Sequence, residues 1–199
     1  ATAEAGDEAL AGADASTPAT EPSPPDAAAH GAAVPAATAE PEEVTIGEVT
    51  LSTSLWRILV DEAGQHVATL DHEQALLQFD TSAVPSQAMI RAAHTLCGIH
   101  RTGGFQPVAA LAKSLELALI ALAQAEARPA SALPVIARAV EALRRLVLCV
   151  EARKAFRAGD AQEATESQDE LDTLRQHAAQ HAELDAETAA AHAALSDEE

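Results

Sequence analysis

The chain has 199 residues, with 31 acidic and 12 basic side chains and a formal net charge of −19. This length allows one domain of ordinary size with flanking segments. The negative charge lies in the two flanking segments. Residues 1–43 hold nine acidic and no basic residues, and residues 158–199 hold twelve acidic residues and one basic residue. The middle segment, 44–157, is nearly neutral, with ten acidic and eleven basic residues. Since no basic stripe is available for phosphate contacts, we expect no nucleic-acid partner.

Composition also divides the chain into three parts. Residues 1–43 contain six of the ten prolines among Ala, Thr and Ser runs without helical or strand periodicity, so we expect a disordered linker there. Residues 44–157 hold nearly all the large apolar side chains and are the part that can bury a core. Residues 158–199 are rich in Ala, Glu and Gln, which favours an acidic helical extension or linker.

The two cysteines and the hydropathy pattern bear on the compartment. Cys97 and Cys149 form neither a CxxC pair nor a disulfide framework, which fits a reducing cytosol. No apolar run approaches the roughly 20 residues of a membrane helix, and no secretory apolar segment is present. We therefore expect a cytoplasmic protein without a membrane partner. Because the chain begins with Ala1, we also expect it to be part of a longer protein.

The first predicted elements precede residue 103. The segment 44–51 (VTIGEVTL) is either extended or a lead-in to a helix. Apolar residues recur at helical spacing over 52–71, with a serine available as N-cap. Residues 72–80 either continue this helix or form a turn. A second helix is expected over 86–102, after Pro85.

Two glycines end the second helix, and the remaining elements are also helical. The spacing of apolar residues predicts a third helix from Pro107 to about Ala127 and a fourth from about Ile136 to Phe156. An acidic fifth helix is expected over about 160–193. Four amphipathic helices with short connections predict an all-α fold, an antiparallel up-and-down four-helix bundle.

The candidate site is centred on His94, in the second helix. Cys97, Gly98 and Arg101 follow it by three, four and seven residues, and Arg91 precedes it by three, so all lie on one side of the helix. A glycine inside a helix costs roughly 0.5–1 kcal/mol relative to alanine. Two explanations for Gly98 are open: access for a partner to the imidazole, or close packing against another helix.

Glu116 lies on the third helix, about as far beyond the glycine turn as His94 lies before it. Antiparallel packing of the two helices would bring the side chains of His94 and Glu116 to the same height along the bundle. A carboxylate that accepts a hydrogen bond from one ring nitrogen fixes the tautomer and leaves the other nitrogen as a nucleophile. The expected role of Glu116 is to orient the imidazole.

The segment HTLCGIHRTGGF resembles the phosphotransfer signature of chemotaxis-type histidine kinases, with His94, Leu96, Gly98, Gly104 and Phe105 at matching positions. The resemblance covers about residues 50–157. It includes an acidic, Ala- and His-containing opening helix (ILVDEAGQHVATL) and the segment LAKSLELAL, which places a glutamate where the family has its orienting carboxylate. The chain also resembles the multi-domain hybrid kinases of pilus chemosensory systems, and this resemblance implies a role in twitching motility.

The resemblance implies a histidine-containing phosphotransfer (HPt) domain. His94 would accept a phosphoryl group from a histidine kinase catalytic domain and pass it to an aspartate on a response-regulator receiver domain. No nucleotide-binding signature is visible, so we expect a phosphotransfer domain without a kinase active site and without a cofactor of its own. ATP and Mg²⁺ are expected on the partner domains. The residues expected beside the phosphate are Cys97, Arg101, Arg91 and Lys113.

Two residues depart from the family pattern. Cys97 stands where the family usually has Lys or Arg, and His100 stands where it has a small residue. Arg101 or Arg91 would then supply the missing positive charge, because an arginine can bind a phosphate bidentately. The alternative is a degenerate bundle that carries no phosphate and acts as a docking or spacing module.

Three other residue groups receive structural interpretations. His100 is expected to be a partly exposed histidine at the helix end, and Cys149 a core residue. His177 and His181 have the i, i+4 spacing of a metal-binding pair, but no third ligand accompanies them, so binding there would be adventitious. We expect no metal site.

Overall fold

The computed structural model describes residues 42–80, 82–125 and 128–196, with side chains as far as residue 180. The predicted linker at 1–43 lies almost wholly outside these residues. Residues 40–199 belong to one compact unit. Its elements, in chain order, are β1 (Glu43–Ile46), β2 (Val49–Ser52), α1 (Thr53–Phe79), α2 (Gln87–Thr102), α3 (Gln106–Gln124), α4 (Ala132–Glu151) and α5 (Ala158–Ser196).

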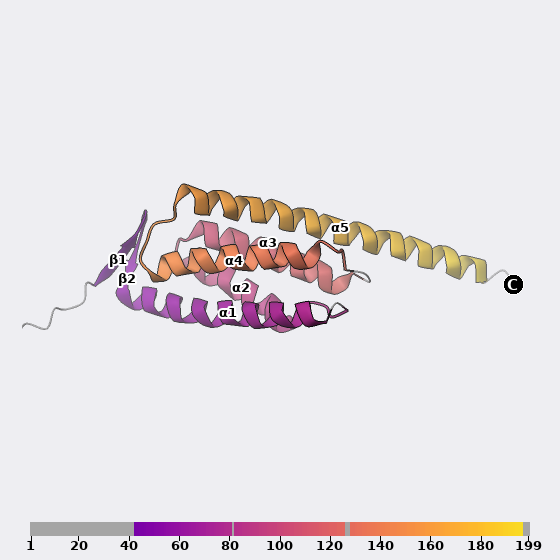
Figure 1. Ribbon diagram of the computed structural model, residues 1–199, viewed down its shortest axis with the longest axis horizontal. Coiled ribbons are helices and arrows are strands. Elements are labelled where there is room, and N and C mark those ends of the chain that lie inside the picture. Colours follow the sequence, from indigo (N-terminus) through magenta and orange to yellow (C-terminus); the bar gives the residue numbers. More distant parts are fainter. Residues whose placement is uncertain (1–41, 81, 126–127, 197–199) are drawn as a thin grey trace, which may run out of the picture. The chain divides into compact units, whose positions relative to one another are not determined.

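The segment left open at 44–51 forms an antiparallel hairpin of β1 and β2, in which Ile46 pairs with Val49. Strand side chains alternate between faces, and here Val44, Ile46 and Leu51 are the buried members. The hairpin lies at the end of the bundle where α1 begins (Figure 1). It therefore closes one end of the helical core.

The first two helices begin with serine caps. The Ser52 hydroxyl accepts a hydrogen bond from the backbone N–H of Leu55 at 3.2 Å, and Ser86 does the same for Met89 at 3.1 Å. Residues 72–79 continue α1 rather than forming a turn. The turn after α2 includes Gly104 at φ +85°, a left-handed conformation that favours glycine.

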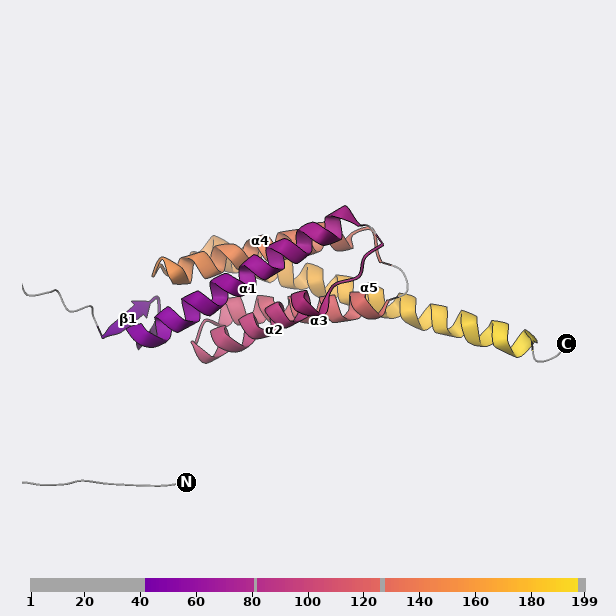
Figure 2. The ribbon, with the colours of Figure 1, turned by 90° about the horizontal axis from the view of Figure 1, so that it is seen from below.

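The helices pack as an antiparallel bundle, in which α1 contacts α2 and α4, and α2 contacts α3 (Figures 1 and 2). The predicted all-α four-helix bundle is confirmed. The fifth helix packs on α3 and α4. There α5 buries Ala164, Leu171 and Leu174, and the side chains of Arg138 and Glu170 form an ion pair of 2.9 Å beside this contact.

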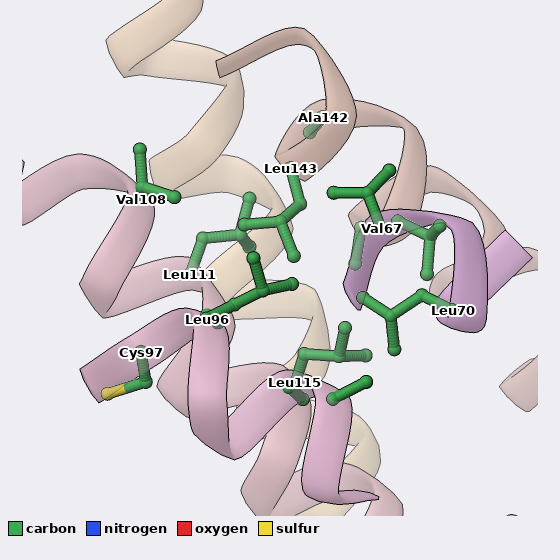
Figure 3. Close-up of a cluster of buried hydrophobic side chains, with 14 of the residues drawn as sticks. Val67, Leu70, Leu96, Cys97, Val108, Leu111, Leu115, Ala142 and Leu143 are labelled. Carbon is green, nitrogen blue, oxygen red and sulfur yellow. The ribbon is translucent and has the colours of Figure 1, made fainter. Parts of the chain in front are cut away.

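All four helices of the bundle contribute leucines to one core (Figure 3). Leu70 of α1, Leu96 of α2, Leu111 and Leu115 of α3 and Leu143 of α4 are fully buried. Shortening any one of them to alanine costs about 2–5 kcal/mol in a well-packed core. This core fixes the spacing between α2 and α3, the two helices that carry the candidate site.

The fourth predicted helix differs from the observed one at both ends. The fourth begins at Ala132, directly after Ser131 and earlier than the predicted Ile136. It ends at Glu151, because Arg153 takes a left-handed conformation with φ 55° that breaks the helical path. Cys149, predicted to be a core residue, is only half-buried.

The helix α3 is more apolar than the sequence pattern led us to expect. Its 19 residues reach the length and hydropathy of a membrane-spanning segment, and half of them are buried inside the bundle. They include the fully buried Leu111, Leu115 and Leu119. The expectation that no run approaches membrane length was therefore wrong, because a core helix enclosed by neighbours is apolar over most of its circumference.

Candidate functional site

His94 lies in the middle of α2 with its side chain 71% exposed. The neighbouring Ala93 and Leu96 are fully buried and hold this helix against the core. The apolar pattern of α2 thus fixes the direction in which His94 points. The imidazole of His94 is thus presented to solvent on a rigid element.

The structure brings His94, Glu116 and Lys113 together. The Nδ1 atom of His94 lies 2.9 Å from Oε1 of Glu116, and the Nζ atom of Lys113 donates to Oε2 of the same carboxylate at 3.0 Å. Because a carboxylate only accepts, the proton of the neutral imidazole lies on Nδ1. This tautomer leaves the Nε2 lone pair free of a proton and exposed to solvent.

The Glu116 carboxyl is charged despite its burial, with only 9% of its side chain exposed. Burial alone would raise its pKa, but the hydrogen bonds from Lys113 and His94 outweigh burial and hold the pKa of Glu116 below its usual value. The carboxylate is therefore ionised at neutral pH. It can compensate a positive charge on the imidazole ring.

Gly98 is not required for close helix packing. A Cβ atom built at this position would meet no atom within 4 Å, whereas one at Gly103 would come within 2.5 Å of the Leu59 side chain. Of the two explanations left open for Gly98, close packing is excluded. The absence of a side chain instead leaves open space beside His94.

That open space is a groove of about 370 Å³ between α1 and α2, adjoining His94 and Gly98. The α1 side of this groove was not predicted from the sequence. Ile58 belongs to the helical pattern of apolar residues over 52–71, which predicts burial, yet its side chain is 61% exposed. The α1 side chains that line the groove are Leu55, Ile58, Leu59 and Glu62.

The Cys97 thiol lies on α2 one turn beyond His94 and is 5% exposed. Its sulfur points away from the leucine cluster (Figure 3). The Arg101 guanidinium folds back along the helix and donates to this sulfur at 3.2 Å. Arg101 thus places its charge near the position where the resemblance expects a cation, while Arg91 is exposed one turn before His94.

His100 is fully buried, so the prediction of a partly exposed helix-end residue was wrong. The turn after α2 folds Phe105 back against the imidazole, with ring centroids 6.2 Å apart in an edge-on arrangement. The Nδ1 atom lies 2.9 Å from the backbone oxygen of Leu96, while Nε2 is buried without a hydrogen-bond partner. Burial lowers the pKa of His100 to about 4.

No group of three or more His, Cys, Asp or Glu side chains is arranged to hold a metal ion within the described part of the chain. His177 lies on α5 beside the α4 contact. The side chain of His181, its predicted partner, lies outside the described side chains.

Comparisons with known proteins agree with this architecture. Residues 54–146 match the family model of the Hpt domain. Among solved structures, the chain is similar to the phosphorylated P1 domain of CheA3 in complex with CheY6 from R. sphaeroides, with 20% identity and a TM-score of 0.50 over 64% of this chain and 98% of that one. No curated protein matches the chain. The fold is an all-α bundle of the HPt type, and the matched region contains both His94 and Glu116.

Proposed function

We propose that the chain is a histidine phosphotransfer module in which His94 carries the phosphoryl group. The observation that carries this proposal is the pairing of an exposed imidazole with a buried, ionised Glu116 at 2.9 Å. A structural histidine has no need of such exposure. A reactive one needs both an accessible nitrogen and a fixed tautomer.

The chemistry follows from this tautomer. The Nε2 lone pair of His94 forms a bond to phosphorus as the bond from phosphorus to the donor's leaving group breaks. The ring then carries the phosphoryl group on Nε2 and its original proton on Nδ1, so it becomes cationic, and the Glu116 carboxylate compensates that charge. In the second step, an aspartate oxygen of a receiver domain attacks phosphorus, and the N–P bond returns its electron pair to Nε2.

The groove beside His94 suits a receiver domain as the acceptor. Its apolar lining, formed partly by Leu55 and Ile58, gives a helix of the partner a surface to bury. Gly98 leaves the approach to Nε2 open. Such a partner would bring its own Mg²⁺ to stabilise the transferring charge. The similar P1 domain of CheA3 was solved in complex with CheY6, and this supports a receiver as the partner here.

The proposal extends to the donor and the setting. The donor would be the catalytic domain of a histidine kinase, which supplies ATP, and the compartment would be the cytosol, as the unpaired Cys97 and Cys149 favour. The sequence resemblance further favours a chemosensory kinase of a pilus system and thus twitching motility. Phosphotransfer profiling against a panel of receiver domains would test this assignment.

The central test uses phosphoramidate, a small donor that replaces the unidentified kinase. Wild-type protein should gain an acid-labile, base-stable phosphoryl group, and His94→Gln should gain none. His72→Gln, which removes another exposed histidine, is the matched control and should label like the wild type. Labelling that persists in His94→Gln, or no labelling of the wild type by phosphoramidate or by any kinase domain, would favour the degenerate docking module instead.

A further inference from the structure

The groove beside His94 carries a negative charge on its α1 side. The α1 side chains that line it, from Leu55 to Glu62, are spaced i, i+3, i+4 and i+7, so they form one stripe along the helix. The first three are apolar. The last, Glu62, is the only carboxylate that lines the groove within the described part of the chain.

We propose that Glu62 selects the receiver domain that docks beside His94, by pairing with a lysine or arginine on the docking helix of that receiver. This inference rests on the proposed function of His94 and names the chemistry of its partner. The apolar part of the stripe gives any amphipathic helix a surface to bury, so it discriminates little between receivers. A single charge at the edge of that surface discriminates by the sign of the residue it meets.

Glu62 lies close to the reacting group. Leu59 marks one end of the groove, because a Cβ atom on Gly103 would come within 2.5 Å of its side chain. Since α1 and α2 run antiparallel, the residues that follow Leu59 on α1 lead toward His94 on α2 (Figure 2). Glu62 follows Leu59 by about one turn. A cation that pairs with Glu62 would therefore lie on the side of the docking helix nearer the aspartate that accepts the phosphoryl group.

The Glu62 carboxylate is available to such a cation. Its side chain is 50% exposed, and Oε2 lies 3.7 Å from Nε2 of His66, which is beyond hydrogen-bond distance. Within the described part of the chain, no lysine or arginine forms an ion pair with Glu62. By contrast, Glu141, Glu163 and Glu170 each pair with an arginine of α4. Glu62 thus keeps a charge that a partner can pair.

The experiment measures transfer from phosphorylated protein, loaded with phosphoramidate and freed of the donor, to receiver domains that accept from the wild type. Glu62→Gln should lower the second-order rate constant about two- to fivefold and weaken its dependence on salt, and Glu62→Lys should lower it further. The rate constant at saturating receiver should stay the same, because Glu62 acts on association. Asp61→Lys makes the same charge change on an exposed neighbour outside the groove and should match the wild type.

A charge exchange completes the test. The docking helix is mapped on the receiver by NMR shift changes on addition of the unphosphorylated domain, and its lysine or arginine is replaced by glutamate. This receiver should accept slowly from the wild type and regain its rate with Glu62→Lys. Equal transfer from Glu62→Lys and the wild type, a docking helix without a basic residue, or no recovery in the exchanged pair would overturn the role of Glu62.

The outcomes separate this inference from the proposed function. A wild type that loads and transfers while the Glu62 variants behave identically leaves the proposed function standing and removes only the selection by Glu62. A wild type that does not load, or that transfers to no receiver, counts against the proposed function itself.

Discussion

Substitution of Gly98 by alanine should stabilise the fold and slow transfer to a receiver. The new methyl group meets no atom within 4 Å, so it adds no strain. Replacing a mid-helix glycine should then raise the free energy of unfolding by about 0.5–1 kcal/mol. For a domain of this size, that corresponds to a rise in Tm of about 1–4 °C. The same methyl group narrows the open space beside His94.

The chain offers a matched control in Gly64, which lies inside α1. A Cβ atom there also meets nothing within 4 Å, but Gly64 lies outside the groove beside His94. Both alanine variants should therefore gain the same stability. Only Gly98→Ala should transfer the phosphoryl group to the receiver more slowly, because a displacement of the receiver by about 1 Å from His94 can lower the rate by up to ~10²-fold. Gly98→Leu should lose more than Gly98→Ala.

The assay separates loading from transfer. Each protein is phosphorylated with phosphoramidate, freed of the donor, and mixed with a receiver domain that accepts the phosphoryl group from the wild type. We expect similar loading of both variants and a decrease of at least about fivefold in transfer for Gly98→Ala alone. Equal transfer rates for Gly98→Ala, Gly98→Leu and Gly64→Ala would refute the argument that Gly98 is kept for access.

Three further changes probe the core, the fifth helix and the cation. The pKa of buried His100 falls to about 4 from 6.5, so the contribution of neutral His100 to stability is full above pH 6.5 and is lost as pH falls toward 4. Urea titrations should show that the free energy of unfolding decreases by about 2 kcal/mol between pH 7 and 5. This decrease should be mostly absent in His100→Phe. Leu171→Ala should lower the free energy of unfolding by about 2–5 kcal/mol in the same titrations, because Leu171 of α5 is fully buried. A decrease below about 1 kcal/mol would contradict the packing of α5 on the bundle. Cys97→Lys should change steady-state phosphorylation by less than about twofold, because Arg101 already places a positive charge beside position 97; a larger increase would mean that the absent lysine limits retention of the phosphoryl group.

Helical spacing predicted the bundle because its signal is repeated along each helix. Leu111, Leu115 and Leu119 recur at intervals of four on α3, and the structure buries all three. Helix ends were less well predicted, since each depends on a single residue. The end of α4 follows from the left-handed conformation of Arg153, a residue type that gives no such signal in the sequence.

Residues of the site were predictable where the chain itself sets their spacing. The glycine turn places α2 antiparallel to α3, and this fixes the level of Glu116 relative to His94. The groove was not predictable, because its far wall comes from α1, whose rotation depends on the whole core. The burial of His100 was not predicted for a related reason. Its imidazole packs against Phe105, which reaches the ring only because the turn after α2 folds the chain back.

The departure at Cys97 has a different meaning once the contacts around Glu116 are considered. A cation one turn beyond His94 would act mainly on the phosphoryl oxygens, after transfer has occurred. Lys113 instead contacts the carboxylate that pairs with the ring, while the Arg101 guanidinium reaches the sulfur of Cys97 itself. Because Arg101 brings a positive charge to that position, a cysteine at position 97 does not by itself make the bundle degenerate.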